Sequence, residues 1–113
     1  MPTYADVRAL LRCVKRPHVL AASPYIEQIC AATGAGDPAR AALALVDSAF
    51  NLETPHGRRL RESIIRCDVE GATTQEAADA MFLSVRQFFR YRAEAMSAVD
   101  YALARIIVAK QVA

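Results

Sequence analysis

The chain has 113 residues, of which 54% are hydrophobic and 23% are charged. This balance supplies enough apolar surface for one packed domain and excludes a largely disordered chain. The formal net charge is only +2, which excludes a polybasic tail. Alanine is abundant, whereas glycine and proline number only four and five, and no run alternates in the manner of a half-buried strand. We therefore expect an all-α fold.

The charges are unevenly distributed along the chain. Residues 1–24 contain four basic side chains against one acidic, whereas residues 25–54 contain one basic against four acidic. Residues 84–113 contain five basic side chains against two acidic. Such asymmetry is typical of a surface that meets an anion, although it also arises by chance.

The first half of the sequence reads as a series of short helices. Apolar residues recur at helical spacing from Tyr4 to Val14, and Pro17 is expected to end this helix. A residue that can cap a helix then stands before proline three times, which predicts three helix starts. These pairs are Ser23–Pro24, Asp37–Pro38 and Thr54–Pro55.

Two further helix starts follow close together. Thr73 and Glu76 have the spacing of a capping box, which predicts a short fifth helix over about 74–81. Ser84 is expected to cap a sixth helix that meets no breaker through Lys110. The prediction is about six helices, with an N-terminal helical part at 1–53 and a second part at 54–113 that ends in the long helix.

The fifth and sixth helices have the features of a helix-turn-helix. The crossing needs small residues in the first helix, which Ala77 and Ala78 supply, and apolar residues at the joint and in the second helix. Residues of this apolar kind fall at the right steps: Met81, Leu83, Phe88 and Tyr91. The alternative is that these two helices form only a structural corner in a helical bundle and bind no nucleic acid.

The stretch GATTQEAADAMFLSVRQFFRYRAEAMSAV resembles the helix-turn-helix of bacterial transcription regulators, including those related to sigma-factor region four. The resemblance covers about a quarter of the chain. It implies binding to double-stranded DNA in transcription regulation. The matching residues are Gly71, Glu76, Ala77, Leu83, Ser84, Arg86, Phe88 and Arg90.

The predicted DNA interface lies at the starts of these two helices. Arg86 and Arg90, four residues apart, can each fork onto a guanine edge or hold a phosphate, and Gln87 can reach adenine or the backbone. Arg58 or Arg59 is a further candidate for a phosphate contact. The full set of predicted DNA-binding residues is Thr73, Thr74, Ser84, Val85, Arg86, Gln87, Phe89, Arg90 and Arg92.

Phe82 departs from the resemblance. Glycine usually stands at this place in the joint, where the backbone turns left-handed. A bulky residue there costs on the order of 1 kcal/mol or more. We therefore expect either a different turn or a Phe82 side chain that packs well enough to offset the cost.

The last helix carries a short heptad pattern. One interpretation is a seam between the two chains of a homodimer, which would suit DNA recognition through paired half-sites. The other is a helix that lies across the N-terminal helices of its own chain. The predicted seam residues are Met96, Val99, Leu103 and Ile106.

Other functions have little support in the sequence. The three cysteines and two histidines are scattered, which indicates no metal site and favours free thiols in the cytoplasm. We expect no cofactor, no catalytic residues and no membrane-spanning segment. The main alternative to DNA binding is a protein–protein interaction or dimerisation module of a larger regulatory assembly.

Overall fold

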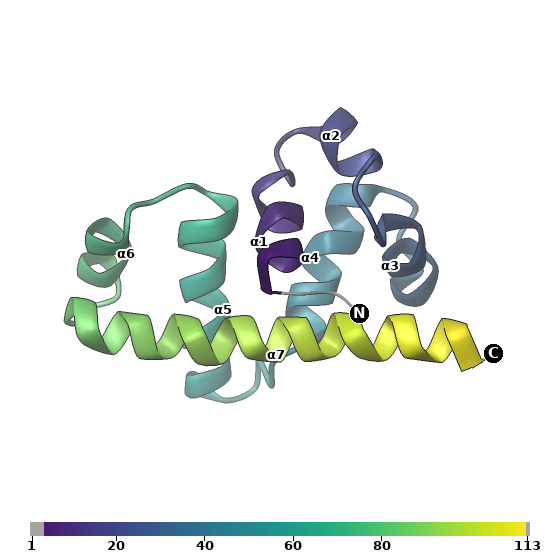
Figure 1. Ribbon diagram of the computed structural model, residues 1–113. Helices are drawn as coiled ribbons and strands as arrows, with labels where there is room; N and C mark the ends of the chain where they lie inside the picture. The colour runs from purple at the N-terminus through teal and green to yellow at the C-terminus, as the bar shows by residue number, and fades with distance from the viewer. Residues whose placement is uncertain (1–3, 113) are drawn as a thin grey trace.

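The long helix α7 (Val85–Val112) runs the length of the molecule, and the other helices pack along it (Figure 1). The computed structural model describes residues 4–112, with side chains for residues 5–109. Within these residues every regular element is helical, as predicted. The preceding elements are α1 (Tyr4–Arg12), α2 (Pro17–Ala21), α3 (Ile26–Thr33), α4 (Pro38–Ser48), α5 (Pro55–Ile64), the π-helical segment η1 (Ile65–Val69) and α6 (Thr74–Ala80).

Two of the three predicted cap–proline starts are confirmed. The Asp37 carboxylate accepts a hydrogen bond from the Arg40 backbone N–H at 3.1 Å and caps α4. The Thr54 hydroxyl accepts one from the Gly57 backbone N–H at 3.0 Å and caps α5. In both helices the following proline occupies the first turn, where its missing N–H costs nothing.

The prediction was wrong at Ser23–Pro24 and at Pro17. The Ser23 hydroxyl donates to the Val19 carbonyl of the preceding turn at 3.1 Å and makes no cap hydrogen bond to a following helix. Helix α3 instead begins after Tyr25, whose φ of 70° places it in the left-handed region. Pro17 does not end α1 but opens the separate short helix α2, so the described residues contain seven α-helices instead of six.

The main core lies between α7 and the N-terminal helices. Met96, Val99 and Leu103 are buried in it beside residues of α1, α3, α4 and α5. The predicted seam between two chains is therefore wrong for these three residues, because their own chain covers them. The alternative, a last helix lying across its own chain, is confirmed; Ile106 is half-buried at the edge of this core.

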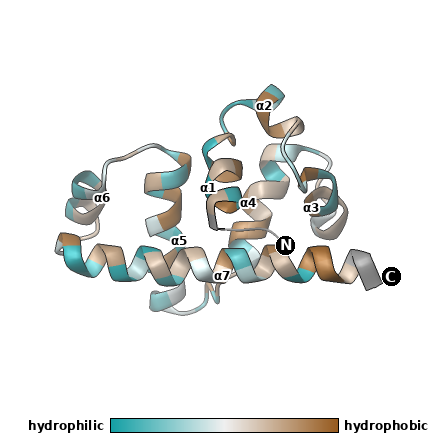
Figure 2. Cartoon of the chain, in the orientation of Figure 1, coloured by the Kyte–Doolittle hydropathy of each residue, from teal (hydrophilic) through white to brown (hydrophobic). Residues whose placement is uncertain are grey.

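A second, smaller apolar cluster holds the opposite end of α7. It consists of Ala77, Ala78, Met81 and Phe88, with Leu83 and Val85 packed against it. Figure 1 shows α6 at this end, away from α1–α4, and Figure 2 shows the most apolar stretch of α7 at the other end. The first turns of α7 are therefore held by this small cluster and lie outside the main core.

Candidate nucleic-acid interface

The joint between α6 and α7 forms a corner, residues 73–90, in which both helices begin at a reciprocal cap. The Thr73 hydroxyl accepts from the Glu76 backbone N–H at 3.1 Å, and the Glu76 carboxylate accepts from the Thr73 backbone N–H at 3.0 Å. This confirms the predicted capping box. We call residues 73–90 the α6–α7 corner.

Ser84 caps α7 as predicted, and Gln87 completes a second box. The Ser84 hydroxyl accepts from the Gln87 backbone N–H at 3.1 Å, and the Gln87 side-chain oxygen accepts from the Ser84 backbone N–H at 3.0 Å. The Ser84 hydroxyl lies 3.2 Å from the same oxygen. The carbonyl of Gln87 is therefore committed to the helix start, and only its amide N–H groups remain for another molecule.

The turn of the corner keeps a left-handed residue although that residue is phenylalanine. Phe82 has a φ of 57°, and its side chain is 95% exposed. The expectation that Phe82 packs to offset the cost is wrong, because the ring contacts so little of the chain. The strain is instead tolerated by hydrogen bonds on either side, since the Phe82 and Leu83 N–H groups donate to carbonyls of α6.

Small residues allow α6 to approach α7 closely. Ala77 and Ala78 are completely buried, and Phe88 of α7 is completely buried beside them. Met81 is 4% exposed and closes the cluster. The predicted roles of these residues in locking the crossing are confirmed.

Arg86 and Arg90 are exposed on the first two turns of α7. Neither side chain has a hydrogen bond or an ion pair with any described residue of the chain. The fold gains little from them. Like charges four residues apart repel by about 0.2–0.5 kcal/mol, and a cation in the first turn opposes the helix dipole.

The prediction that Arg92 contacts DNA is corrected by the structure. The Arg92 side chain is only 15% exposed and forks onto the Asp68 carboxylate of η1, with N–O distances of 2.7 and 3.2 Å. The Asp68 side chain is 1% exposed, and the Arg8 guanidinium lies 3.9 Å from it. Arg92 therefore joins α7 to η1 and α1 within the protein.

Arg58 and Arg59 also have partners within the chain. Arg59 donates to the Met81 carbonyl at 2.9 Å and lies 5.3 Å from the centre of the Tyr91 ring, so it ties α5 to the corner. Arg58 donates to the Leu52 carbonyl at 3.0 Å. Among the seven arginines between residues 58 and 92, Arg86 and Arg90 are the two without such a partner in the described structure.

The other residues predicted to contact DNA differ in how exposed they are. Phe89 is 53% exposed on the same side of α7 as Arg86 and Arg90. Thr73 and Ser84 are exposed at the helix starts, where their hydroxyls are used as caps. Thr74 and Val85 are half-buried, and Val85 packs against the small cluster.

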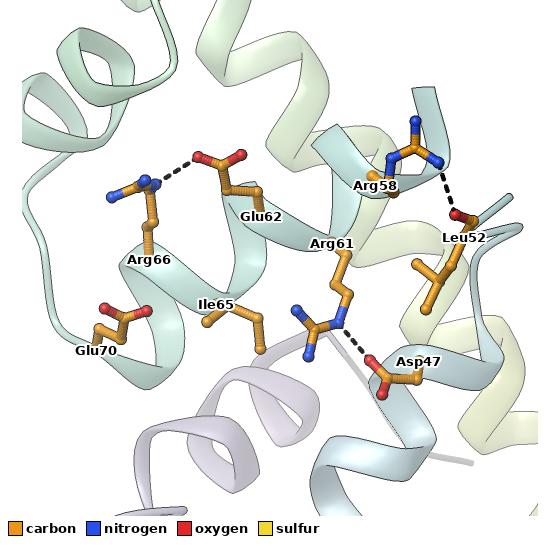
Figure 3. A pocket seen from close by; sticks show the side chains of 8 residues that line it. All are labelled: Asp47, Leu52, Arg58, Arg61, Glu62, Ile65, Arg66 and Glu70. Atoms are coloured by element: carbon orange, nitrogen blue, oxygen red, sulfur yellow. Dashed lines mark hydrogen bonds and ion pairs between the residues drawn. The ribbon is translucent and has the colours of Figure 1, made fainter. Parts of the chain in front are cut away.

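A hollow of about 600 Å³ lies along α5 and η1 (Figure 3). Two of its arginines pair with neighbouring acids, Arg61 with Asp47 and Arg66 with Glu62 at 2.6 Å, and the third, Arg58, donates to the Leu52 carbonyl. Because opposite charges alternate along its wall, this hollow offers an anion much less than the α6–α7 corner does.

The described residues contain no cluster of metal ligands, and the Cys67 thiol is not activated. No three histidine, cysteine or acidic side chains among them gather closely enough to hold a metal ion. Burial raises the pKa of the Cys67 thiol, Asp68 acts in the same direction, and only Arg92 opposes them. Cys67 therefore favours the less reactive thiol form. No helix in the described part is long and apolar enough to cross a membrane.

Sequence reasoning missed Asp68 and the His56–Glu94 pair. His56 and Glu94 lie 2.8 Å apart beside Arg90, on the wall of a hollow of about 280 Å³ that Gln87 and Tyr91 also line. Arg92 lies 24 residues after its partner Asp68, and Glu94 lies 38 residues after its partner His56. No local spacing rule detects such pairs, because helical charge pairs are recognised only three or four residues apart.

The cap at Glu76 should make the stability of the fold depend on pH. Hydrogen bonds from the backbone and then from the side chain of Thr73 hold the pKa of Glu76 below its ordinary value. A carboxyl with a lowered pKa in the folded state stabilises the fold above its unfolded pKa, and this contribution is lost as the pH falls through the folded pKa. We therefore expect the stability difference between wild type and Glu76→Gln to be largest near neutral pH and to shrink on acidification.

Thermal unfolding followed by circular dichroism at a series of pH values from about 7 to about 3 measures this difference. A difference that stays constant over the whole series would contradict the role of the charged carboxylate at this cap.

No protein-family model, curated protein or solved structure matches this chain. Any function must therefore be argued from the corner itself.

Proposed function

We propose that the α6–α7 corner binds double-stranded DNA and that the chain acts in bacterial transcription regulation in the cytoplasm. The observation that carries the proposal is the pair of exposed arginines, Arg86 and Arg90, on a helix whose start is capped and free of the main core. They have no partner among the described residues, whereas the arginines around them are held by carboxylates or carbonyls.

The geometry of α7 suits a groove. Arg86 and Arg90 lie one turn apart on one face, with an axial separation of about 6 Å. Guanidinium groups so placed can contact phosphates or fork onto guanine edges. The buried Phe88 and the two caps hold this face in one orientation, so its order is present before DNA arrives.

The proposal predicts a weak but measurable dependence of DNA binding on salt. Each phosphate that is neutralised lowers the slope of log K against log salt by about 0.9, so the slope should be about −2 for each protein chain if both arginines contact phosphates, and shallower if they contact guanine edges instead. Fluorescence anisotropy of a labelled random-sequence duplex, titrated with the protein at several salt concentrations, measures the slope. Absence of binding at low salt by the folded protein would refute the proposal.

A second candidate is an assembly module that does not bind DNA. It is favoured by the exposed ring of Phe82 and by a hollow between α3 and the end of α7, which Ala32, Ile106 and Ala109 line. A homodimer, if it forms, would use this apolar region instead of the buried seam residues. Sedimentation over a range of protein concentrations at low and high salt tests this candidate, because self-association through an apolar contact should not weaken as salt is raised. Such self-association without any binding to DNA would favour the assembly module.

A further inference from the structure

Phe89 lies on the face of α7 that carries the two unpaired arginines. It is three residues after Arg86 and directly before Arg90, and 53% of it is exposed. It is in neither of the two apolar clusters, whereas its neighbour Phe88 is completely buried. The fold therefore uses one of these two aromatic rings and leaves the other on the outer face.

A duplex offers an apolar side chain in this position one distinctive partner. Among the base edges of the major groove, the thymine C5 methyl is the apolar group, and phenylalanine is among the side chains that contact it. The guanine edge, which accepts two hydrogen bonds, is the matching partner of an arginine. The face thus combines two groups that suit guanine with one that suits thymine.

We propose that this face reads a thymine methyl through Phe89, flanked by guanines that Arg86 and Arg90 contact; this rests on the proposed DNA binding. The spacing supports the arrangement. The two arginines are separated by about 6 Å along the helix, which corresponds to about two base-pair steps. Phe89 lies about 4.5 Å along the helix from Arg86 and about 1.5 Å from Arg90, so a thymine next to the guanine of Arg90, on the side toward that of Arg86, is within its reach.

A protein partner suits the same face less well. An apolar surface laid over Phe89 would also have to cover the guanidinium groups of Arg86 and Arg90, neither of which is paired with an acid among the described residues; the Glu94 carboxylate near Arg90 is hydrogen-bonded to His56 instead. Removing unpaired charges from water is costly. DNA avoids this cost because its phosphates and guanine edges supply acceptors next to the thymine methyl.

The test compares two duplexes that differ only in the methyl group. One has alternating guanine and thymine along one strand, and the other has deoxyuridine in place of every thymine. Wild type is expected to bind the thymine duplex about two- to fourfold more tightly, as the burial of one methyl group predicts. The Phe89→Ala variant is expected to bind both duplexes equally.

Phe82→Ala is the matched control. It removes the other exposed phenylalanine of the corner, which lies in the turn and outside the proposed reading face. This variant should keep the preference for thymine. Circular dichroism and thermal unfolding of each variant confirm that it is folded.

The outcomes separate the two proposals. Equal, salt-sensitive binding of wild type to both duplexes overturns the methyl contact and leaves the proposed DNA binding intact. A preference that survives in Phe89→Ala also overturns it, because the preference then comes from the shape of the duplex or from another residue. Failure of wild type to bind either duplex overturns both.

Discussion

Replacing Asp68 with asparagine is expected to lower the free energy of unfolding by about 3–5 kcal/mol. The carboxylate of Asp68 is almost completely buried and accepts two hydrogen bonds from Arg92, which is itself 15% exposed. Arg8 approaches the same carboxylate. The variant would leave the Arg92 charge buried against a neutral amide. Urea unfolding near neutral pH, followed by circular dichroism, measures the loss.

Asp47→Asn is the matched control for this prediction. Asp47 also pairs with an arginine, Arg61, but its side chain is 43% exposed and that of Arg61 is 37% exposed. Exposed pairs contribute about 0–1 kcal/mol, because water and salt screen them. Similar losses in the two variants would show that Asp68 does not hold α7, η1 and α1 together in the way its contacts indicate.

The double substitution Arg86→Ala/Arg90→Ala is expected to weaken DNA binding at least about thirtyfold while leaving the fold intact. Each arginine that forks onto a base contributes about 1–3 kcal/mol, so the two together contribute at least about 2 kcal/mol. The free energy of unfolding should stay the same or rise slightly, since the variant removes a like-charge pair and a cation at a helix start. Anisotropy titration and urea unfolding of the same sample measure both quantities.

A second double variant separates this effect from a change in net charge. Arg12 and Arg40 are exposed on α1 and α4, away from the corner, and their replacement by alanine removes the same total charge. This control should change DNA affinity only slightly at moderate salt, where distant charges are screened. Equal losses of affinity in the two double variants would contradict binding through the corner.

Much of the fold could be predicted because its signals are local. The caps at Asp37, Thr54, Thr73 and Ser84 each act within three residues of the chain, and all four form as expected. Ser23 failed for a physical reason that sequence does not reveal. Its hydroxyl can bond forward to a helix start or back to a preceding carbonyl; here it bonds back to Val19, and α3 begins only after Tyr25.

The interface was only partly predictable. The arginines at 86, 90 and 92 look equivalent in sequence, but a carboxylate 24 residues away takes Arg92 into the protein. The heptad pattern at Met96, Val99 and Leu103 shows that an apolar face is covered, not which chain covers it. The structure places that face against the chain's own N-terminal helices.

The most direct test of the account is a two-dimensional ¹H–¹⁵N NMR titration of the labelled protein with a short duplex at low salt. If the corner binds DNA, the amide signals that move most should belong to the two helix starts, residues 73–76 and 84–90, while those of α1–α4 change little. Shifts concentrated instead on α3 and the distal end of α7, or no shifts at all from the folded protein, would contradict binding through Arg86 and Arg90.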